Sequence, residues 1–316
     1  MTDNEPYVRE DVRAFLDLLE QIGGKSVEEV GAVEGRKAMR TLSDMAEAAP
    51  RKLGRIEDLT CPGPAGDIPI RLYDTQTDRY PSPCVMFIHG GGFVIGDLDV
   101  YHAVCTEISQ SLDLPVISVD YRLAPEHPFP AAPDDCEAAA RWIASSPDKL
   151  GFEVTGLVIS GDSAGGNLTI VTTNALTNEP ADVPVIVQAP IYPVASDVSN
   201  HRSLREFGEG YFLTAAQMGW FTRQYGGDPA DARLTPMAGP CANTPPTVLC
   251  TAGLDPLRDS GREYAAHLVQ QGTDVSYLEF PGIIHGFVTL RKAMPSGNDD
   301  FDDFLEALEL MVERYR

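Results

Sequence analysis

The sequence is poor in basic residues and has no cysteines spaced for metal binding. It contains 24 Lys and Arg against 47 Asp and Glu, a formal net charge of −23. A surface this acidic repels phosphate backbones and anionic lipids, which argues against nucleic acid partners and against stable membrane association. The six cysteines are scattered and form no C-x-x-C motif. This pattern predicts free thiols in a reducing compartment rather than a disulfide framework or a zinc site.

Long apolar runs and targeting signals are also lacking. No uninterrupted apolar stretch reaches the roughly 20 residues needed to span a bilayer. Residues 1–6 are polar and acidic, unlike the basic and then apolar start of a signal peptide. We therefore expect a cytoplasmic protein. Repeats and low-complexity segments are absent too, and 43% hydrophobic with 22% charged residues is the composition of an ordinary globular protein.

Short apolar runs alternate with segments of helical spacing from about residue 84 onward. Near-continuous apolar strands that alternate with helices predict an α/β fold, with a mostly parallel sheet and helices on both faces. The expected strands cover 84–89, 114–121, 157–160, 183–189, 246–252 and 275–280, and the expected helices cover 100–112, 133–146, 164–177, 258–271 and 299–314.

Other stretches lie outside this alternation. Residues 8–21 and 27–47 have helical spacing, and 60–73 are typical of a hairpin. A long segment rich in Phe, Tyr, Trp and Met interrupts the alternation later. We therefore divide the chain into N-terminal cap helices (1–55), a first core part (56–194), a cap insertion (195–235) and a second core part (236–316).

Ser163 lies in the motif Gly161-Asp162-Ser163-Ala164-Gly165, between an expected strand and an expected helix. A serine hydroxyl is a poor nucleophile unless the backbone exposes it where a base can take its proton. A sharp strand-turn-helix does this, and small residues two positions before and after the serine permit close packing. The motif predicts Ser163 as a catalytic nucleophile.

Three consecutive glycines, Gly90 to Gly92, follow His89 at the end of the first expected parallel strand. Such a run costs backbone entropy and contributes nothing to a core. It is useful where bare N–H groups must face developing negative charge, as in the oxyanion hole of a serine hydrolase. The N–H of Ala164, directly after the nucleophile, would be a further donor. His89 is expected to hold the glycine loop rather than to move a proton.

A catalytic acid and a histidine should follow the nucleophile in that order, at the ends of later strands. Asp255 lies just past the expected strand 246–252, and His285 follows the expected strand 275–280 with Gly286 after it. Their position and order predict that Asp255 and His285 complete a triad with Ser163.

These motifs, together with the segment from Asp120 to Pro130, resemble the motif set of the bacterial hormone-sensitive-lipase-like (family IV) esterases of the α/β-hydrolase superfamily. The resemblance covers about residues 60–316. It implies the α/β-hydrolase fold with a helical cap, and short-chain esters as substrates. Neither a metal nor an organic cofactor is expected. The implied site consists of the triad Ser163, Asp255 and His285 and the oxyanion donors Gly91, Gly92 and Ala164.

The aromatic and apolar side chains of the cap insertion predict a roofed pocket. Such a pocket suits small-molecule esters with short to medium acyl chains better than emulsified fat. An amidase or deacetylase on the same triad and a lipase with interfacial activation remain open. A non-catalytic ligand-binding receptor is disfavoured because all three triad residues are present. The residues predicted to contact substrate are Phe93, Phe207, Tyr211, Leu213, Ile284 and Phe287.

Three further expectations concern structure rather than chemistry. Arg122 and Glu126 should form ion pairs that shape the pocket wall. Asp162 should point away from the catalytic base and pin neighbouring loops. The expected strand 275–280 should lie at an edge of the sheet, and because edges invite pairing, we expect a homodimer.

Overall fold

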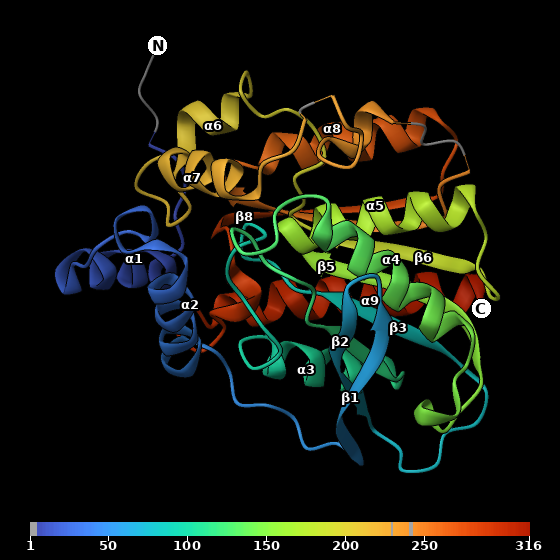
Figure 1. The fold of residues 1–316 in the computed structure, drawn as a ribbon. Helices are drawn as coiled ribbons and strands as arrows, with labels where there is room; N and C mark the ends of the chain where they lie inside the picture. Colours follow the sequence, from blue (N-terminus) through green and yellow to red (C-terminus); the bar gives the residue numbers. More distant parts are fainter. Residues whose placement is uncertain (1–4, 229, 240–242) are drawn as a thin grey trace.

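A single eight-stranded sheet runs through the centre of the computed structural model, which describes residues 5–228, 230–239 and 243–316 (Figure 1). The strand order is β1-β2-β4-β3-β5-β6-β7-β8. Strand β2 is antiparallel to both of its neighbours, and the other pairs are parallel. The predicted mostly parallel sheet is therefore confirmed. The strands are β1 Arg55–Gly63, β2 Gly66–Asp74, β3 Ser82–Ile88, β4 Val116–Val119, β5 Val154–Asp162, β6 Val185–Ile191, β7 Thr247–Leu254 and β8 Val275–Ile284.

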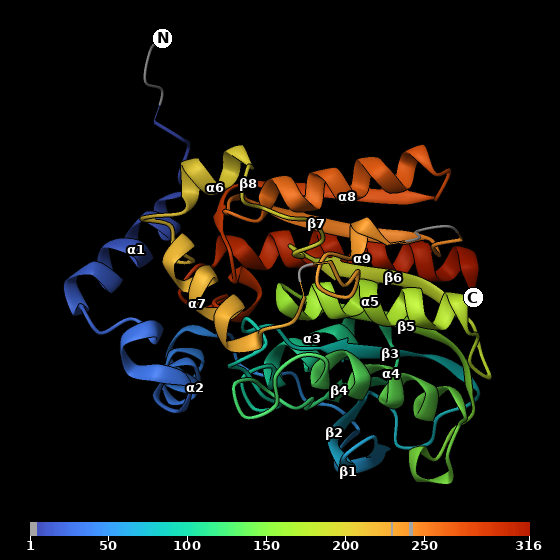
Figure 2. The same cartoon turned by 45° about the horizontal axis from the view of Figure 1, so that its top comes forward.

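Helices cover both faces of this sheet. Helices α3 and α9 lie on one face, and α4, α5 and α8 lie on the other (Figures 1 and 2). These helices are α3 His102–Leu112, α4 Ala131–Ala144, α5 Ala164–Asn178, α8 Arg258–Gln270 and α9 Ser296–Tyr315, and the short 3-10 turns are Asp148–Leu150, Pro236–Ala238 and Phe287–Thr289.

Strand β3 shows why the central strands are almost continuously apolar. Successive side chains of a strand point to opposite faces. Val85 and Phe87 accordingly pack into the core beneath α3 and α9, whereas Met86 and Ile88 pack into the core beneath α4 and α5. Because both faces are covered, neither set can be polar.

Four further helices gather beyond the carboxyl ends of the parallel strands (Figures 1 and 2). Helix α2 contacts α7, and α6 contacts α8. Within α2, Gly31 has φ 82° and ψ 175°, so the helix is broken there. The helices are α1 Glu10–Ile22, α2 Val27–Ala46, α6 Arg202–Phe207 and α7 Ala215–Tyr225. They fall within the predicted cap segments, and the division into core and cap stays a prediction.

Other expectations can be compared directly with the structure. Strand β8 lies at one edge of the sheet, as predicted. The cysteines within the described residues are free and buried, while Cys241 lies outside the described residues. No helix in the described part of the chain is both long and apolar enough to cross a membrane. The cytoplasmic location stays a prediction.

Candidate active site

Ser163 stands on a strained turn between β5 and α5. It has φ 55° and ψ −114°, a conformation that non-glycine residues rarely adopt, and its N–H donates to the carbonyl of Ile191 at 2.9 Å. The flanking glycines are required by close backbone approach. A Cβ on Gly161 or on Gly165 would overlap the carbonyl oxygen of Ile88 at the end of β3. The turn therefore depends on the small residues that the motif contains.

The imidazole of His285 lies between the hydroxyl of Ser163 and the carboxylate of Asp255. Nε2 is 2.9 Å from Ser163 Oγ, and Nδ1 is 2.7 Å from Asp255 Oδ2. Because a carboxylate only accepts, Nδ1 carries the hydrogen, and Nε2 of the neutral ring accepts from the serine hydroxyl. Asp255 is fully buried, and its other oxygen accepts the N–H of Leu257 at 2.7 Å. The structure thus brings together the three side chains that the sequence pattern singled out.

Strand order explains this convergence. Asp255 directly follows β7 and His285 directly follows β8, and these two strands are parallel neighbours. Ser163 follows β5, on the same side of the sheet. Carboxyl ends of parallel strands meet at one edge of a sheet, which is where ligands bind in open α/β folds.

The glycine loop after β3 offers backbone donors beside Ser163. Gly91 has φ 112° and Gly92 has φ 60°. Within the described ranges, neither N–H has a hydrogen-bond acceptor. Ala164 is the first residue of α5, where backbone N–H groups have no partner inside the helix. The three predicted oxyanion donors therefore line the same cavity as Ser163 and have N–H groups available for an anion.

Asp162 holds this loop from beneath. Its buried carboxylate accepts the N–H of Gly90 at 2.7 Å and the hydroxyls of Tyr101 and Tyr192 at 3.0 and 3.2 Å. Burial raises the pKa of Asp162 to about 6, while His285 and these hydrogen bonds act in the opposite direction. Asp162 therefore pins neighbouring segments, as predicted.

His89 is a buried neutral support for the loop. Its Nδ1 lies 2.7 Å from the carbonyl oxygen of Gly90, and its ring stacks on Tyr121 with centroids 4.4 Å apart. Burial lowers the pKa of His89 to about 4, so the ring is uncharged at neutral pH. This placement agrees with the holding role expected from the sequence.

The segment after β4 contributes ion pairs, as predicted. Arg122 pairs with Asp135 at 2.7 Å, and Glu126 pairs with Arg36 at 2.6 Å. Arg36 belongs to α2 and also donates to the carbonyl of Ala124 at 3.0 Å. Glu126 and its segment therefore connect the N-terminal helices to the wall of the site.

A cavity of about 920 Å³ contains Ser163, His285 and the glycine loop. Of the predicted substrate contacts, Phe93 and Leu213 line it. Ile284 and Phe287 do not, because both are fully buried in the core. This corrects their assignment as substrate contacts.

Phe207 and Tyr211 also lie outside the lining. Phe207 is buried under the guanidinium of Arg258, 5.0 Å from its ring centroid, and its ring meets that of Tyr211 edge to face. These two aromatic residues pack within the cap and against the core instead, which corrects the prediction for both.

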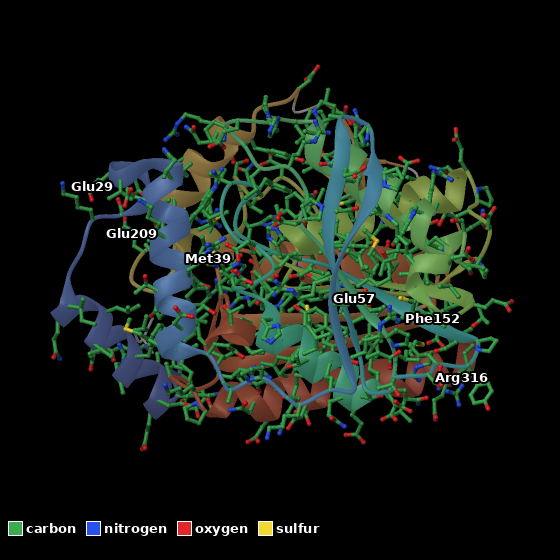
Figure 3. The ribbon with its side chains drawn as sticks, turned by 60° about the horizontal axis from the view of Figure 1, so that its bottom comes forward. Glu29, Met39, Glu57, Phe152, Glu209 and Arg316 are labelled. Carbon is green, nitrogen blue, oxygen red and sulfur yellow. The ribbon has the colours of Figure 1, made fainter. Side chains whose placement is uncertain are left out.

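The sequence interpretation missed the contribution of α2 to the cavity. Val27, Val30, Met39 and Leu42 line it from this helix. Figure 3 labels Met39 on the side of α2 that faces the body of the molecule. The apolar residues of this segment have helical spacing, but spacing alone does not reveal whether they face a core or a cavity.

No set of three or more His, Cys, Asp or Glu side chains within the described residues is arranged to hold a metal ion. The polar groups gathered at Ser163 are its hydroxyl, the imidazole of His285 and the backbone amides of the glycine loop. This set can attack a carbonyl carbon, move a proton and stabilise an oxyanion.

A family model described as an alpha/beta hydrolase fold matches residues 85–289. An ethyl acetate hydrolase of Pseudomonas putida is 33% identical over 312 residues, which cover 95% of this chain and 98% of the relative. A carboxylic ester hydrolase of Mycobacterium tuberculosis is 36% identical over 292 residues, covering 89% and 77%. A solved ester hydrolase from the metagenome of Lake Arreo has a TM-score of 0.91 and 34% identity, covering 97% of this chain and 99% of that one.

Proposed function

This chain belongs to the bacterial hormone-sensitive-lipase-like esterases of the α/β-hydrolase superfamily and is a carboxylic ester hydrolase, and from that premise we propose that Ser163, His285 and Asp255 cleave short- to medium-chain acyl esters. One observation carries the proposal: a continuous hydrogen-bonded chain from the serine hydroxyl through the imidazole to a buried carboxylate. The chain ends inside a large cavity beside unpaired backbone donors.

The first step is attack of Ser163 Oγ on the ester carbonyl carbon. His285 Nε2 takes the hydroxyl proton as the new C–O bond forms, and the carbonyl electron pair moves onto oxygen. Asp255 accepts from Nδ1–H throughout, so it fixes the tautomer and stabilises the imidazolium.

The oxyanion accepts hydrogen bonds from the N–H groups of Gly91, Gly92 and Ala164. Donors placed where charge develops are worth about 3–4 kcal/mol each in this kind of chemistry. The tetrahedral intermediate then collapses, the bond to the leaving oxygen breaks, and His285 gives its proton to the departing alcohol. Water attacks the acyl-enzyme by the same steps, with His285 again as the base, and releases the acid.

The cavity supports the proposed substrate range. Its lining is mostly apolar and is roofed by α2 and α7, which we propose act as the cap together with α1 and α6. A cavity volume of about 920 Å³ lies in the range of pockets that bury most of a small molecule. We expect p-nitrophenyl butyrate to be hydrolysed much faster than the palmitate ester. A preference for the palmitate would refute the proposed acyl range.

The nucleophile is tested by Ser163→Ala. We expect kcat to fall by about 10⁴-fold or more with a fold indistinguishable by circular dichroism, because the remaining site can only bind and polarise the ester. A fluorophosphonate probe should label the wild type and not the variant. Near-normal turnover by the variant would reject Ser163 as nucleophile.

We also propose that two chains associate through β8. The outer edge of β8 has no neighbouring strand within the described residues. The segment before α1 covers only its end, where the N–H of Arg9 donates to the carbonyl of Gly282 at 3.2 Å. Unpaired edge groups favour pairing with another strand. Light scattering should give twice the chain mass, and a monomer at micromolar concentration would refute the association.

A further inference from the structure

The oxyanion loop holds two consecutive residues in the left-handed region. Gly92 has φ 60° and Phe93 has φ 63°. Phenylalanine rarely adopts this conformation, and such residues persist only where the surrounding structure holds them. Contacts with neighbouring elements must therefore hold Gly92 and Phe93 in this conformation.

Both residues are held by the same cap helix. Phe221 and Tyr225 are four residues apart in α7, so their side chains lie on one face of the helix. Each lies against one residue of the loop, and both line the catalytic cavity.

Phe221 occupies the space that a side chain at Gly92 would fill. A Cβ on Gly92 would overlap Cγ of the Phe221 ring and lie 2.6 Å from its Cδ1 and Cδ2. The ring of Trp220 meets that of Phe221 edge to face, with centroids 5.3 Å apart. The absent side chain at Gly92 therefore permits direct contact between the cap and the backbone that carries the donor.

Tyr225 stacks on Phe93. The two rings are nearly parallel, at 5°, with centroids 3.9 Å apart. Tyr225 is in turn fixed to the core, because its carbonyl accepts the N–H of Phe129 at 2.9 Å. Its buried hydroxyl has no hydrogen-bond partner within the described residues, so the ring and not the hydroxyl makes the contact.

We propose that Phe221 and Tyr225 are positioning residues, through which α7 holds Gly92 and Phe93 so that the N–H groups of Gly91 and Gly92 face the developing oxyanion. This inference rests on the proposed function and deepens it. The cap then does more than select substrate. A misplacement of about 1 Å at a reacting group costs on the order of 100-fold in rate, so loosening this contact lowers kcat rather than KM alone.

A double-mutant cycle tests the contact between Phe221 and Gly92. In the wild-type background, Gly92→Ala forces Phe221 and the loop apart, and we expect kcat for p-nitrophenyl butyrate to fall about 100-fold. In the Phe221→Ala background the clash with the ring is gone and only the strain of a non-glycine residue at φ 60° remains, so we expect Gly92→Ala to cost about tenfold there. Equal costs in the two backgrounds would overturn the proposal.

The second contact is tested by Tyr225→Ala and its conservative partner Tyr225→Phe. The alanine variant should lower kcat about tenfold and weaken inhibition by a trifluoromethyl ketone, a mimic of the tetrahedral intermediate, by the same factor. Tyr225→Phe keeps the ring and should restore both. Arg223→Ala, on the exposed face of the same helix, controls for loss of helix stability. A change confined to KM in the alanine variant would refute the assignment.

Amide chemical shifts separate this inference from the proposed function. The resonances of Gly91 and Gly92 report the loop whether or not the protein turns over an ester. We expect them to move in Phe221→Ala and Tyr225→Ala and to stay in place in Arg223→Ala. Unmoved resonances would refute the inference alone, whereas a wild type without esterase activity would refute the proposed function alone.

Discussion

The floor and the roof of the cavity fix their side chains by different means. The floor consists of Ser163, Asp255 and His285 at strand ends; Asp255 and His285 are buried, and short hydrogen bonds join all three. The roof consists of α2 and α7, and on its N-terminal side, in α1 and α2, several apolar side chains face solvent and two glycines precede α2. Leu18, Ile22, Val33 and Met45 are between 50% and 64% exposed.

The roof is firmly attached at one end. Glu47, just past α2, accepts Nε–H of Arg291 at 2.8 Å, and both side chains are buried. Arg291 also lies 3.5 Å from Glu107 of α3. Toward its other end α2 is broken at Gly31. The floor is therefore built for one fixed geometry, and the roof is fixed on one side of its break and less constrained on the other.

The largest expected effect belongs to the floor. Asp255→Asn keeps an oxygen for the N–H of Leu257 and turns an amide N–H donor toward Nδ1 of His285, which favours the wrong tautomer, so we expect kcat to fall by about 10⁴-fold with little change in KM. Steady-state kinetics on p-nitrophenyl butyrate measures it. A loss below about tenfold would break the comparison, because it would be no larger than the loss expected for Tyr225→Ala in the roof.

Two glycine substitutions sharpen the comparison. Gly165→Ala places a methyl group against the carbonyls of Ile88 and His89, so we expect the chain to fold poorly or to lose several kcal/mol of unfolding free energy. Gly31→Ala meets no atom within 4 Å and carries only backbone strain, about 1–3 kcal/mol, which a local shift of α2 relieves. Thermal unfolding should separate the two variants clearly. Similar melting temperatures for Gly165→Ala and Gly31→Ala would contradict the difference between floor and roof.

The floor should also make stability depend on pH. The pKa of Asp162 is raised from 3.8 to about 6, so between these values the native state binds more protons than the unfolded state. Asp162 therefore contributes about 3 kcal/mol to the free energy of unfolding below pH 3.8, and this contribution is lost as the pH rises from 3.8 through about 6. Urea unfolding at pH 4.5 and 7 covers about 2 kcal/mol of this loss, and the decrease in stability between the two pH values should be larger by that amount in the wild type than in Asp162→Asn, where Asp120, whose pKa is also raised to about 6, still titrates.

The exposed roof pair Lys37–Glu34 is the matched control for that prediction. Both side chains are more than half exposed. Glu34→Gln should change the unfolding free energy by less than about 1 kcal/mol at either pH. A pH-dependent effect as large as that of Asp162 would remove the difference between the two regions.

The smallest effect concerns substrate fit beneath α2. Met39→Ala removes an apolar contact from the cavity wall, and we expect KM for p-nitrophenyl hexanoate to rise about fivefold while kcat stays within twofold. Met45→Ala, on the exposed side of the same helix, should leave both constants unchanged. A larger change in kcat than in KM for Met39→Ala would place α2 in the chemistry of the floor.

The same contrast explains what the sequence could predict. The turn at Ser163 and the glycines after His89 are local, because close backbone approach demands particular residue types at fixed spacing. Asp255 and His285 could be located from their order and from the strands before them. These strands were predictable because their runs are apolar throughout, with bounds that differ from the structure by a few residues.

The cavity wall could not be predicted in the same way. An apolar residue near the site has the same local pattern whether it lines the cavity, as Leu213 and Phe93 do, or packs inward, as Phe207 does. The contact of Phe221 with Gly92 joins positions far apart in the chain, so no local sequence pattern predicts it. Side-chain direction in this region follows from tertiary packing alone.

The break in α2 brings the beginning of the helix back over its own middle. Val27 lies so close to Gly35 that a Cβ there would be 2.6 Å from the valine Cγ2. Val27 and Val30 of this short segment line the cavity, and the segment belongs to none of the elements that carry Ser163, Asp255 and His285. We therefore expect an exchange of residues 25–30 to change which esters fit the cavity while the triad stays in place.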